Sequence, residues 1–165
     1  MLTPKLPHAD TRVDLYQALT PQWVALSEGE VNRTANLANL SAAMYAAFDW
    51  HWVGFYLVDA QRDELVLGPF QGPVACTRLH HGKGVCAAAW DSKKAQVVDN
   101  VHDFPGHIAC SALSISELVM PVVVNGEVVA VLDIDSVKVS GFSQVDVDGL
   151  TAILHHLAAH WNHWE

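Results

Sequence analysis

The stretch Leu118-Val-Met-Pro-Val-Val-Val-Asn-Gly-Glu-Val-Val-Ala-Val-Leu-Asp133 holds two apolar, β-branched runs that meet at Asn125-Gly126. Asn-Gly between such runs is the strongest short-range signal for a two-residue hairpin turn, because both turn positions need a positive φ. The stretch therefore predicts two antiparallel strands, at residues 118–124 and 127–133.

The segments before this hairpin carry further strand patterns. An aromatic and β-branched run at residues 51–58 predicts a strand, and a turn returns the chain into a hairpin partner at residues 64–67. Residues 68–114 hold many of the glycines and prolines and predict ordered loop, interrupted by a short helix at 85–90 and a short strand at 96–98. Loops mounted on a rigid sheet are common carriers of functional groups.

Helical patterns lie at both ends of the chain. Thr20 and Pro21 indicate a helix boundary, with Thr20 as N-cap and Pro21 at the first helical position. Ser143 and Asp146 form a capping box that opens the last helix. The N-terminal helices are predicted at residues 14–19, 21–27 and 31–48. Helices at both ends of a largely antiparallel sheet predict one α+β domain over residues 1–165.

Charge and hydropathy exclude several functions. Nine Lys and Arg against 18 Asp and Glu give a net charge of −9, so a nucleic acid partner is not expected. No apolar run reaches the roughly 18 residues of a membrane span. The first residues lack the apolar core of a signal peptide, so we expect a cytoplasmic protein in a reducing compartment.

The chain has three cysteines, Cys76, Cys86 and Cys110, within 35 residues. An odd number without zinc-type spacing favours thiols that change partners over a structural disulfide. Cys110 lies in a loop-like stretch close to His107, where a thiol can act as a nucleophile, and Cys76 ends another such loop. The alternative is that all three are small buried residues, which suits Cys86 in Val-Cys-Ala-Ala-Ala best.

Three carboxylates surround the end of the hairpin. Asp133 and Asp135 project from the same face of their strand, and Glu117 begins the preceding one. A two-residue turn alone would set Glu117 opposite Ile134, on the wrong face. Pro121 indicates a bulge that shifts the register by one and brings the three acids together. Clustered acids raise one another's pKa and so provide a proton donor. A solvated strand end is the commoner explanation of such acids.

Two further groups of residues have alternative interpretations. Trp52 and Tyr56 share a face of the aromatic strand, where they serve either the core or the wall of a small pocket. His156 and His160 have the i, i+4 spacing of metal ligands. No carboxylate general base accompanies them, and a solvated helix end is the simpler explanation, so no metal and no cofactor is predicted.

Taken together, these segments resemble the free methionine-R-sulfoxide reductases, which are built on a GAF domain. The resemblance covers residues 16–157 and includes a stretch around each cysteine. The matching stretches are Trp52-Val-Gly-Phe-Tyr56, Leu67-Gly-Pro-Phe-Gln-Gly72, Ala75-Cys76, Gly82-Lys-Gly-Val-Cys86, Val101-His-Asp-Phe-Pro-Gly-His-Ile-Ala-Cys110, Ser116-Glu-Leu-Val-Met-Pro121 and Val131-Leu-Asp-Ile-Asp-Ser136.

The resemblance implies reduction of free L-methionine (R)-S-oxide to L-methionine through a cysteine sulfenic acid and an intramolecular disulfide. It implies that Cys110 is the nucleophile, Cys76 the main resolving thiol and Cys86 an auxiliary one. Thioredoxin would recycle the disulfide, and the protein would be a homodimer, with the terminal helices as a candidate interface.

The resemblance also assigns substrate contacts. Glu117, Asp133 and Asp135 match the family's acidic cluster, and its aromatic wall corresponds to Trp52 and Tyr56. The family commonly carries Asp after the nucleophile, where this chain has Ser111. Two other functions are considered: a GAF sensor that binds a small ligand without chemistry, and a cysteine-based metal sensor, which the irregular cysteine spacing disfavours.

Overall fold

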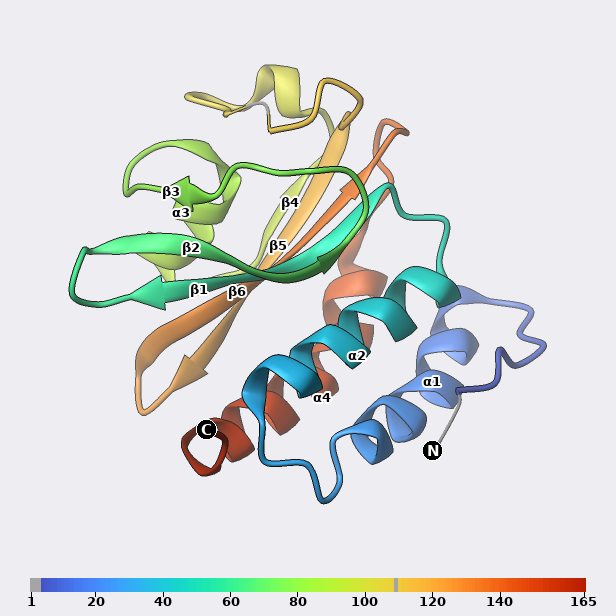
Figure 1. Ribbon diagram of the computed structural model, residues 1–165. Coiled ribbons are helices and arrows are strands. Elements are labelled where there is room, and N and C mark those ends of the chain that lie inside the picture. The colour runs from blue at the N-terminus through green and yellow to red at the C-terminus, as the bar shows by residue number, and fades with distance from the viewer. Residues whose placement is uncertain (1–3, 109) are drawn as a thin grey trace.

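The computed structural model describes residues 4–108 and 110–165; Ala109, in the stretch that leads to Cys110, and residues 1–3 lie outside the described part. A six-stranded sheet in the order β3-β2-β1-β6-β5-β4 carries α1, α2 and α4 on one face and α3 on the other (Figure 1). Each pairing within it is antiparallel. The predicted α+β class, with helices from both ends of the chain beside the sheet, is confirmed.

The elements follow one another as α1 (Arg12–Leu26), α2 (Arg33–Ala47), β1 (Trp52–Asp59), β2 (Glu64–Gln71), β3 (Arg78–Leu79), α3 (Gly84–Ser92), β4 (Gln96–Val98), the 3₁₀ turn η1 (Val101–Asp103), β5 (Ser116–Val124), β6 (Glu127–Ser136), α4 (Gln144–His160) and the 3₁₀ turn η2 (Trp161–His163). Among the described residues, no helix combines the length and the apolar character needed to cross a bilayer.

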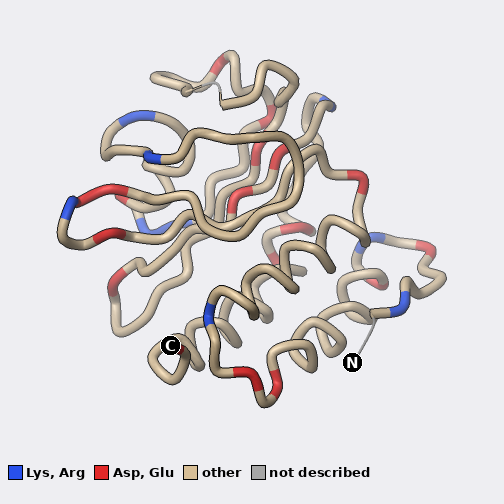
Figure 2. The backbone as a smooth tube through the Cα atoms, in the orientation of Figure 1, with Lys and Arg blue, Asp and Glu red and all other residues tan. Residues whose placement is uncertain are grey.

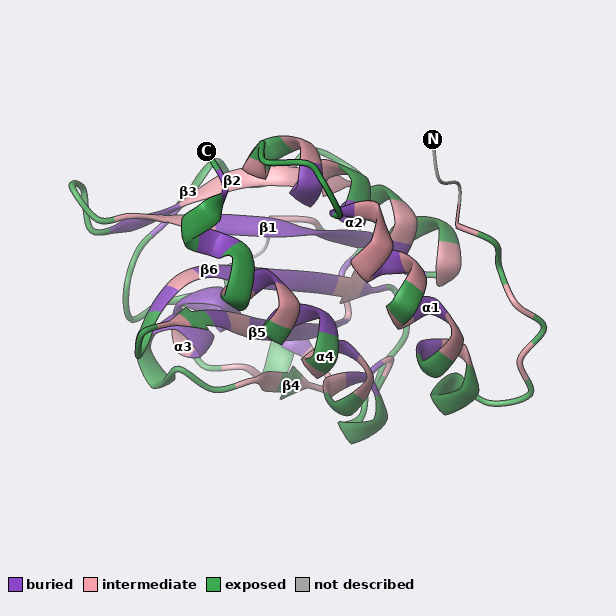
Figure 3. Cartoon of the chain, turned by 90° about the horizontal axis from the view of Figure 1, so that it is seen from below, coloured by how far each residue is buried: buried purple, intermediate pink, exposed green. Residues whose placement is uncertain are grey.

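Two apolar cores lie on opposite faces of the sheet. Val53 and Phe55 of β1 pack with α1, α2 and α4, whereas Trp52 and Tyr56 pack with α3. Figure 3 shows β1 and β6 buried between these layers. Successive side chains of β1 alternate between the two faces. Because burial of each large apolar side chain contributes roughly 1.5–3 kcal/mol, the packed residues hold the strand in this orientation. The alternation places Trp52 and Tyr56 on the α3 face.

The β5–β6 hairpin has the predicted turn and contains a bulge. Asn125 and Gly126 both have positive φ, as the turn requires. The register shifts between Val122 and Val123, so that Val129 of β6 is the extra residue. The predicted position of the bulge at Pro121 is wrong, because Pro121 pairs regularly with Val131. β4 pairs only with residues 117–119, so β5 is an edge strand at the proline, where a missing N–H is tolerated.

The predicted helix boundary at Thr20-Pro21 is also wrong, because α1 runs continuously through both residues. Thr20 does not cap a helix; its Oγ1 donates to the carbonyl of Tyr16, 2.8 Å away. Leu19 and Trp23, on either side of the proline, are completely buried. We infer that their packing outweighs the roughly 3 kcal/mol that proline costs within a helix.

The start of α4 confirms the predicted capping box of Ser143 and Asp146. The Asp146 carboxylate is buried, accepts from Tyr16 Oη at 2.8 Å and pairs with Arg12 at 3.0 Å. The first and last helices are therefore joined by a buried polar contact. The predicted strand at residues 64–67 is longer, since β2 extends to Gln71.

Candidate active site

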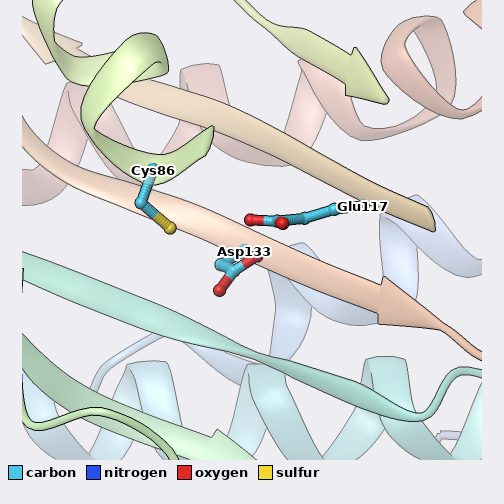
Figure 4. A group of neighbouring side chains, drawn as sticks. All are labelled: Cys86, Glu117 and Asp133. Carbon is cyan, nitrogen blue, oxygen red and sulfur yellow. The ribbon is translucent and has the colours of Figure 1, made fainter. Parts of the chain in front are cut away.

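The bulge in β6 brings Glu117 into one row with Asp135 across the sheet. Asp135 of β6 lies opposite Trp52 of β1 on one side and opposite Glu117 of β5 on the other. Asp133 stands two residues along β6, opposite Gly54, and therefore shares the face of Asp135. Figure 4 shows Glu117 and Asp133 pointing toward Cys86, which α3 carries above the same face. Three strands and a helix thus converge on one acidic cluster.

A glycine allows the aromatic residues to pack closely at one end of this row. A Cβ at Gly54 would lie 2.3 Å from Phe70 Cβ and 2.7 Å from the Trp52 ring. The Trp52 indole stacks on the Phe70 ring at 5.2 Å and donates from Nε1 to the Pro73 carbonyl, 3.0 Å away. Tyr56 Oη donates to the Cys76 carbonyl at 2.9 Å. These contacts hold the loop that carries Cys76 against the sheet.

A disulfide joins Cys76 to Cys110, with their Cα atoms 5.3 Å apart. It ties the loop after β2 to the loop before β5, across 34 residues of sequence. Cys86 is a free, buried cysteine within α3. The bonded pair consists of the two cysteines to which the resemblance assigns the nucleophilic and main resolving roles; those roles themselves stay predictions.

One cavity collects nearly all the residues predicted for the site. It holds about 540 Å³ with its open mouth included. Cys76 is not part of the wall, although its neighbour Ala75 is. The predicted residues that line the cavity are Trp52, Tyr56, Cys86, Cys110, Glu117, Asp133 and Asp135.

Burial controls the protonation of the acids. Glu117 and Asp133 are each only 7% exposed, so they do not form the solvated strand end that the sequence alone allowed. Burial raises the pKa of both carboxyls well above the usual range, and the charges of the neighbouring acids raise it further. Burial also raises the pKa of Asp135, to about 6. The cluster therefore retains protons close to neutral pH and can donate one.

The same burial bears on whether the cluster suits a metal. Ligand atoms of Cys86, Glu117 and Asp133 lie within 4.8 Å of one another. Metal ligands must be deprotonated, but burial, followed by the charges of Asp133 and Glu117, raises the pKa of the Cys86 thiol as well. These residues therefore suit shared protons better than a bound cation.

Two of the histidines of α4, His156 and His160, make contacts elsewhere and do not line this cavity. His156 Nε2 lies 2.7 Å from Ser27 Oγ, and His160 Nδ1 lies 2.9 Å from the His156 carbonyl oxygen.

The structure adds residues that sequence reasoning did not assign to the site. Ser111, Lys83 and His107 line the cavity. Ser111 Oγ lies 3.1 Å from His51 Nε2, and the backbone N–H of His51 donates to the Asp135 carbonyl. Lys83 and His107 belong to the stretches around Cys86 and Cys110 that carry the family resemblance, so the sequence could have indicated them as site residues. No local sequence pattern indicated the contact of His51 with Ser111, because it joins residues 60 positions apart.

Comparison with known proteins agrees with this geometry. The GAF domain family matches residues 33–162. The chain is 44% identical over 147 residues to the free methionine-R-sulfoxide reductase of Escherichia coli, covering 88% of each protein. It is 51% identical to GAF domain-containing protein A of Dictyostelium discoideum, covering 87% of this chain and 90% of that one.

A solved structure extends the comparison to three dimensions. The free methionine-R-sulfoxide reductase of Neisseria meningitidis, in complex with its substrate, superposes with a TM-score of 0.95 at 42% identity, covering 99% of this chain and 97% of that one. Sequence and fold thus agree along nearly the whole chain, which belongs to the free methionine-R-sulfoxide reductase family of GAF-domain proteins.

Proposed function

We propose that this enzyme reduces free L-methionine (R)-S-oxide to L-methionine through a Cys110 sulfenic acid and a Cys76–Cys110 disulfide that thioredoxin recycles. The proposal depends above all on one observation. Cys110, a wall residue of the acid-lined cavity, is bonded to a second cysteine that stands outside that wall. This arrangement suits a nucleophile and its resolving thiol. The nucleophile must contact the substrate, whereas the resolving thiol must reach only the sulfenic acid that forms on the nucleophile.

Substrate binding is the first step. The ammonium group of a free amino acid carries a positive charge, which an ionised carboxylate of the cluster attracts. Trp52, which lines the cavity, offers an apolar surface to the methyl group and helps to select the R epimer. Binding of the ammonium group by the acidic cluster would also disfavour methionine sulfoxide within a protein, because the backbone nitrogen there is an uncharged amide.

Proton donation activates the sulfoxide. Glu117 and Asp135 lie opposite each other, and burial raises the pKa of both. Glu117 also makes a side-chain hydrogen bond with Asp133. A proton held by Glu117 or Asp135 is available to the sulfoxide oxygen, which makes the methionine sulfur electrophilic. The acids also oppose a negative sulfur beside them. We therefore infer that the Cys110 thiolate forms mainly after the cationic substrate has bound.

Attack by Cys110 transfers the oxygen. Its sulfur bonds to the substrate sulfur, the protonated oxygen passes to Cys110, and methionine leaves with its sulfur reduced by two electrons. Cys110 sulfur, oxidised by two electrons, is then a sulfenic acid. The Cys76 thiol attacks that sulfur, forms the disulfide and releases water. A reduced dithiol returns both cysteines to thiols and becomes a disulfide itself.

A coupled assay tests the proposal. Protein with thioredoxin, thioredoxin reductase and NADPH should consume NADPH when free methionine-R-sulfoxide is added, and the S epimer should give little turnover. Cys110→Ser should abolish consumption. Persisting consumption in that variant would exclude Cys110 as the nucleophile, and no consumption by the unmodified protein would refute the function.

The cytoplasmic location, the homodimer and the single-domain organisation stay predictions. Sedimentation equilibrium of the purified chain measures the oligomeric state directly.

A further inference from the structure

Three exposed apolar residues lie within three positions of the bonded cysteines in the sequence. Val74, two residues before Cys76, is 87% exposed; Ile108 and Leu113, which flank Cys110, are 36% and 63% exposed. Three residues of chain reach at most about 10 Å, so the Cα atom of each of the three lies within about that distance of the Cα atom of a bonded cysteine. We call Val74, Ile108 and Leu113 the apolar collar. Exposed apolar residues that gather around one point are typical of interaction sites.

The two loops that carry the disulfide are also uncharged. Residues 68–77 and 104–116 contain no Asp, Glu, Lys or Arg, although the chain as a whole has a net charge of −9. Figure 2 shows charged residues mainly at turns and at the ends of helices and strands, with most of α2 and the second half of α4 uncharged as well. These loops therefore place no acidic side chain of their own against an approaching protein, and the charged residue that shares the cavity wall with Val74 and Ile108 at its mouth is the exposed Lys83. The loops add no charge repulsion to the contact.

We propose that the apolar collar is the docking surface for the protein dithiol that reduces the Cys76–Cys110 bond. The identity of the partner depends on the proposed function, which requires an external dithiol. A partner thiolate attacks one sulfur of the bond, and the other sulfur leaves as a thiolate and takes up a proton. The partner's second thiol then breaks the mixed disulfide. One partner disulfide and two free cysteines result.

A contact built on a few exposed side chains suits this kind of partner. Redox partners meet briefly, through interfaces at the small end of the protein–protein range, below about 1,200 Å². A small thiol needs no surface of this kind, because it contacts only the sulfur it attacks. Reduction by a protein dithiol should therefore depend on the collar, and reduction by dithiothreitol should not.

Leu113→Glu tests the collar, because Leu113 is exposed and is not a residue of the cavity wall. The matched control is Val31→Glu, at a residue that is 55% exposed in the loop between α1 and α2. Protein with its disulfide closed is mixed with reduced thioredoxin or with dithiothreitol. The rate at which free cysteines appear is then measured by rapid alkylation and mass spectrometry. No methionine sulfoxide is present, so failure of the proposed function and failure of the docking surface are separate results.

Leu113→Glu should lower the second-order rate constant for thioredoxin roughly tenfold, the effect of losing one important interface residue. It should leave the rate with dithiothreitol unchanged, and Val31→Glu should change neither. Leu113→Arg should slow thioredoxin as Leu113→Glu does, because either charge disrupts an apolar contact.

Several results would overturn the proposal. Faster reduction by thioredoxin in Leu113→Arg would show that charge attraction, and not an apolar contact, guides the partner. If Leu113→Glu slowed reduction by thioredoxin and by dithiothreitol equally, Leu113 would act by maintaining the structure of the loop and not by contacting the partner. A change from dimer to monomer in Leu113→Glu would make the collar a contact between two copies of the chain. If thioredoxin reduced the disulfide of the unmodified protein no faster than dithiothreitol does, there would be no reason to infer a docking surface.

Discussion

Glu117 lies directly opposite Asp135 across β5 and β6, although a two-residue turn alone would set it opposite Ile134. The extra residue at Val129 changes the register by one, and a change of one moves a side chain to the other face of a sheet. A single inserted residue near the turn therefore assembles the acidic cluster at the far end of the hairpin.

The first prediction concerns catalysis by this pair. Glu117→Gln and Asp135→Asn should each lower kcat for free methionine-R-sulfoxide by roughly 10²–10⁴-fold, the range expected for the loss of a general acid. The amides fill the same space but cannot donate a carboxylic proton, so the fold should persist. Steady-state kinetics with circular dichroism of each variant measures both effects.

Glu127→Gln is the control for these variants, because Glu127 lies exposed at the tip of the same hairpin. It should keep full activity. Unchanged rates in Glu117→Gln and Asp135→Asn would show that the acids play no part in proton transfer.

The second prediction concerns the pH dependence of stability. The pKa of Asp135 rises from 3.8 to about 6 on folding, so between these values the folded chain holds a proton that the unfolded chain has lost. Asp135 should therefore lower the free energy of unfolding as pH rises from about 4 to about 6, by about 1.4 kcal/mol for each pH unit. Glu117 and Asp133, whose pKa values are also raised by burial, add to this fall. Asp135→Asn should flatten this part of the profile. Urea titrations at intervals of pH measure the slopes, and parallel profiles for the two proteins would contradict the assignment.

Local signals in the sequence predicted much of the fold. The Asn125-Gly126 turn and the Ser143–Asp146 capping box depend on residues within a few positions of one another, and both are present. Alternation along β6 likewise places Asp133 and Asp135 on one face, whereas Glu117 joins them only through the bulge.

Contacts between distant residues could not be predicted in this way. Proline remains within α1 because Leu19 and Trp23 pack against other elements, which no local pattern around Pro21 records. The bulge at Val129 has no distinctive residue to mark it. Cysteine spacing alone left open which two of the three would be bonded.

The third prediction tests the close packing around Gly54. Gly54→Ala should destabilise the protein by about 1–3 kcal/mol, the usual cost of overpacking. The new Cβ would meet the Phe70 backbone at 2.8 Å as well as its side chain. It would also displace the Trp52 ring, so KM for the sulfoxide should rise. Urea denaturation and steady-state kinetics measure the two effects.

Gly126→Ala is the control for this variant. Gly126 has φ +83° and open space around it, so alanine there adds backbone strain without a clash. It should reduce stability while leaving KM unchanged. An unchanged KM in Gly54→Ala would mean that the Trp52 wall is not held in place by the glycine.

The fourth prediction separates the two thiols that could resolve a sulfenic acid at Cys110. Cys86 is buried in α3 and its thiol pKa is raised, so it is a poor nucleophile in the folded protein. Cys86→Ala should therefore still form the Cys76–Cys110 disulfide after one turnover. Cys76→Ser should release methionine once and then stop, with Cys110 held as a sulfenic acid. Thiol counting and peptide mass spectrometry after a single turnover distinguish these states. A Cys86–Cys110 bond in Cys76→Ser, with sustained turnover, would show that α3 moves enough to bring its thiol to the nucleophile. Cys86 would then be a second resolving residue rather than a neutral part of the cavity wall.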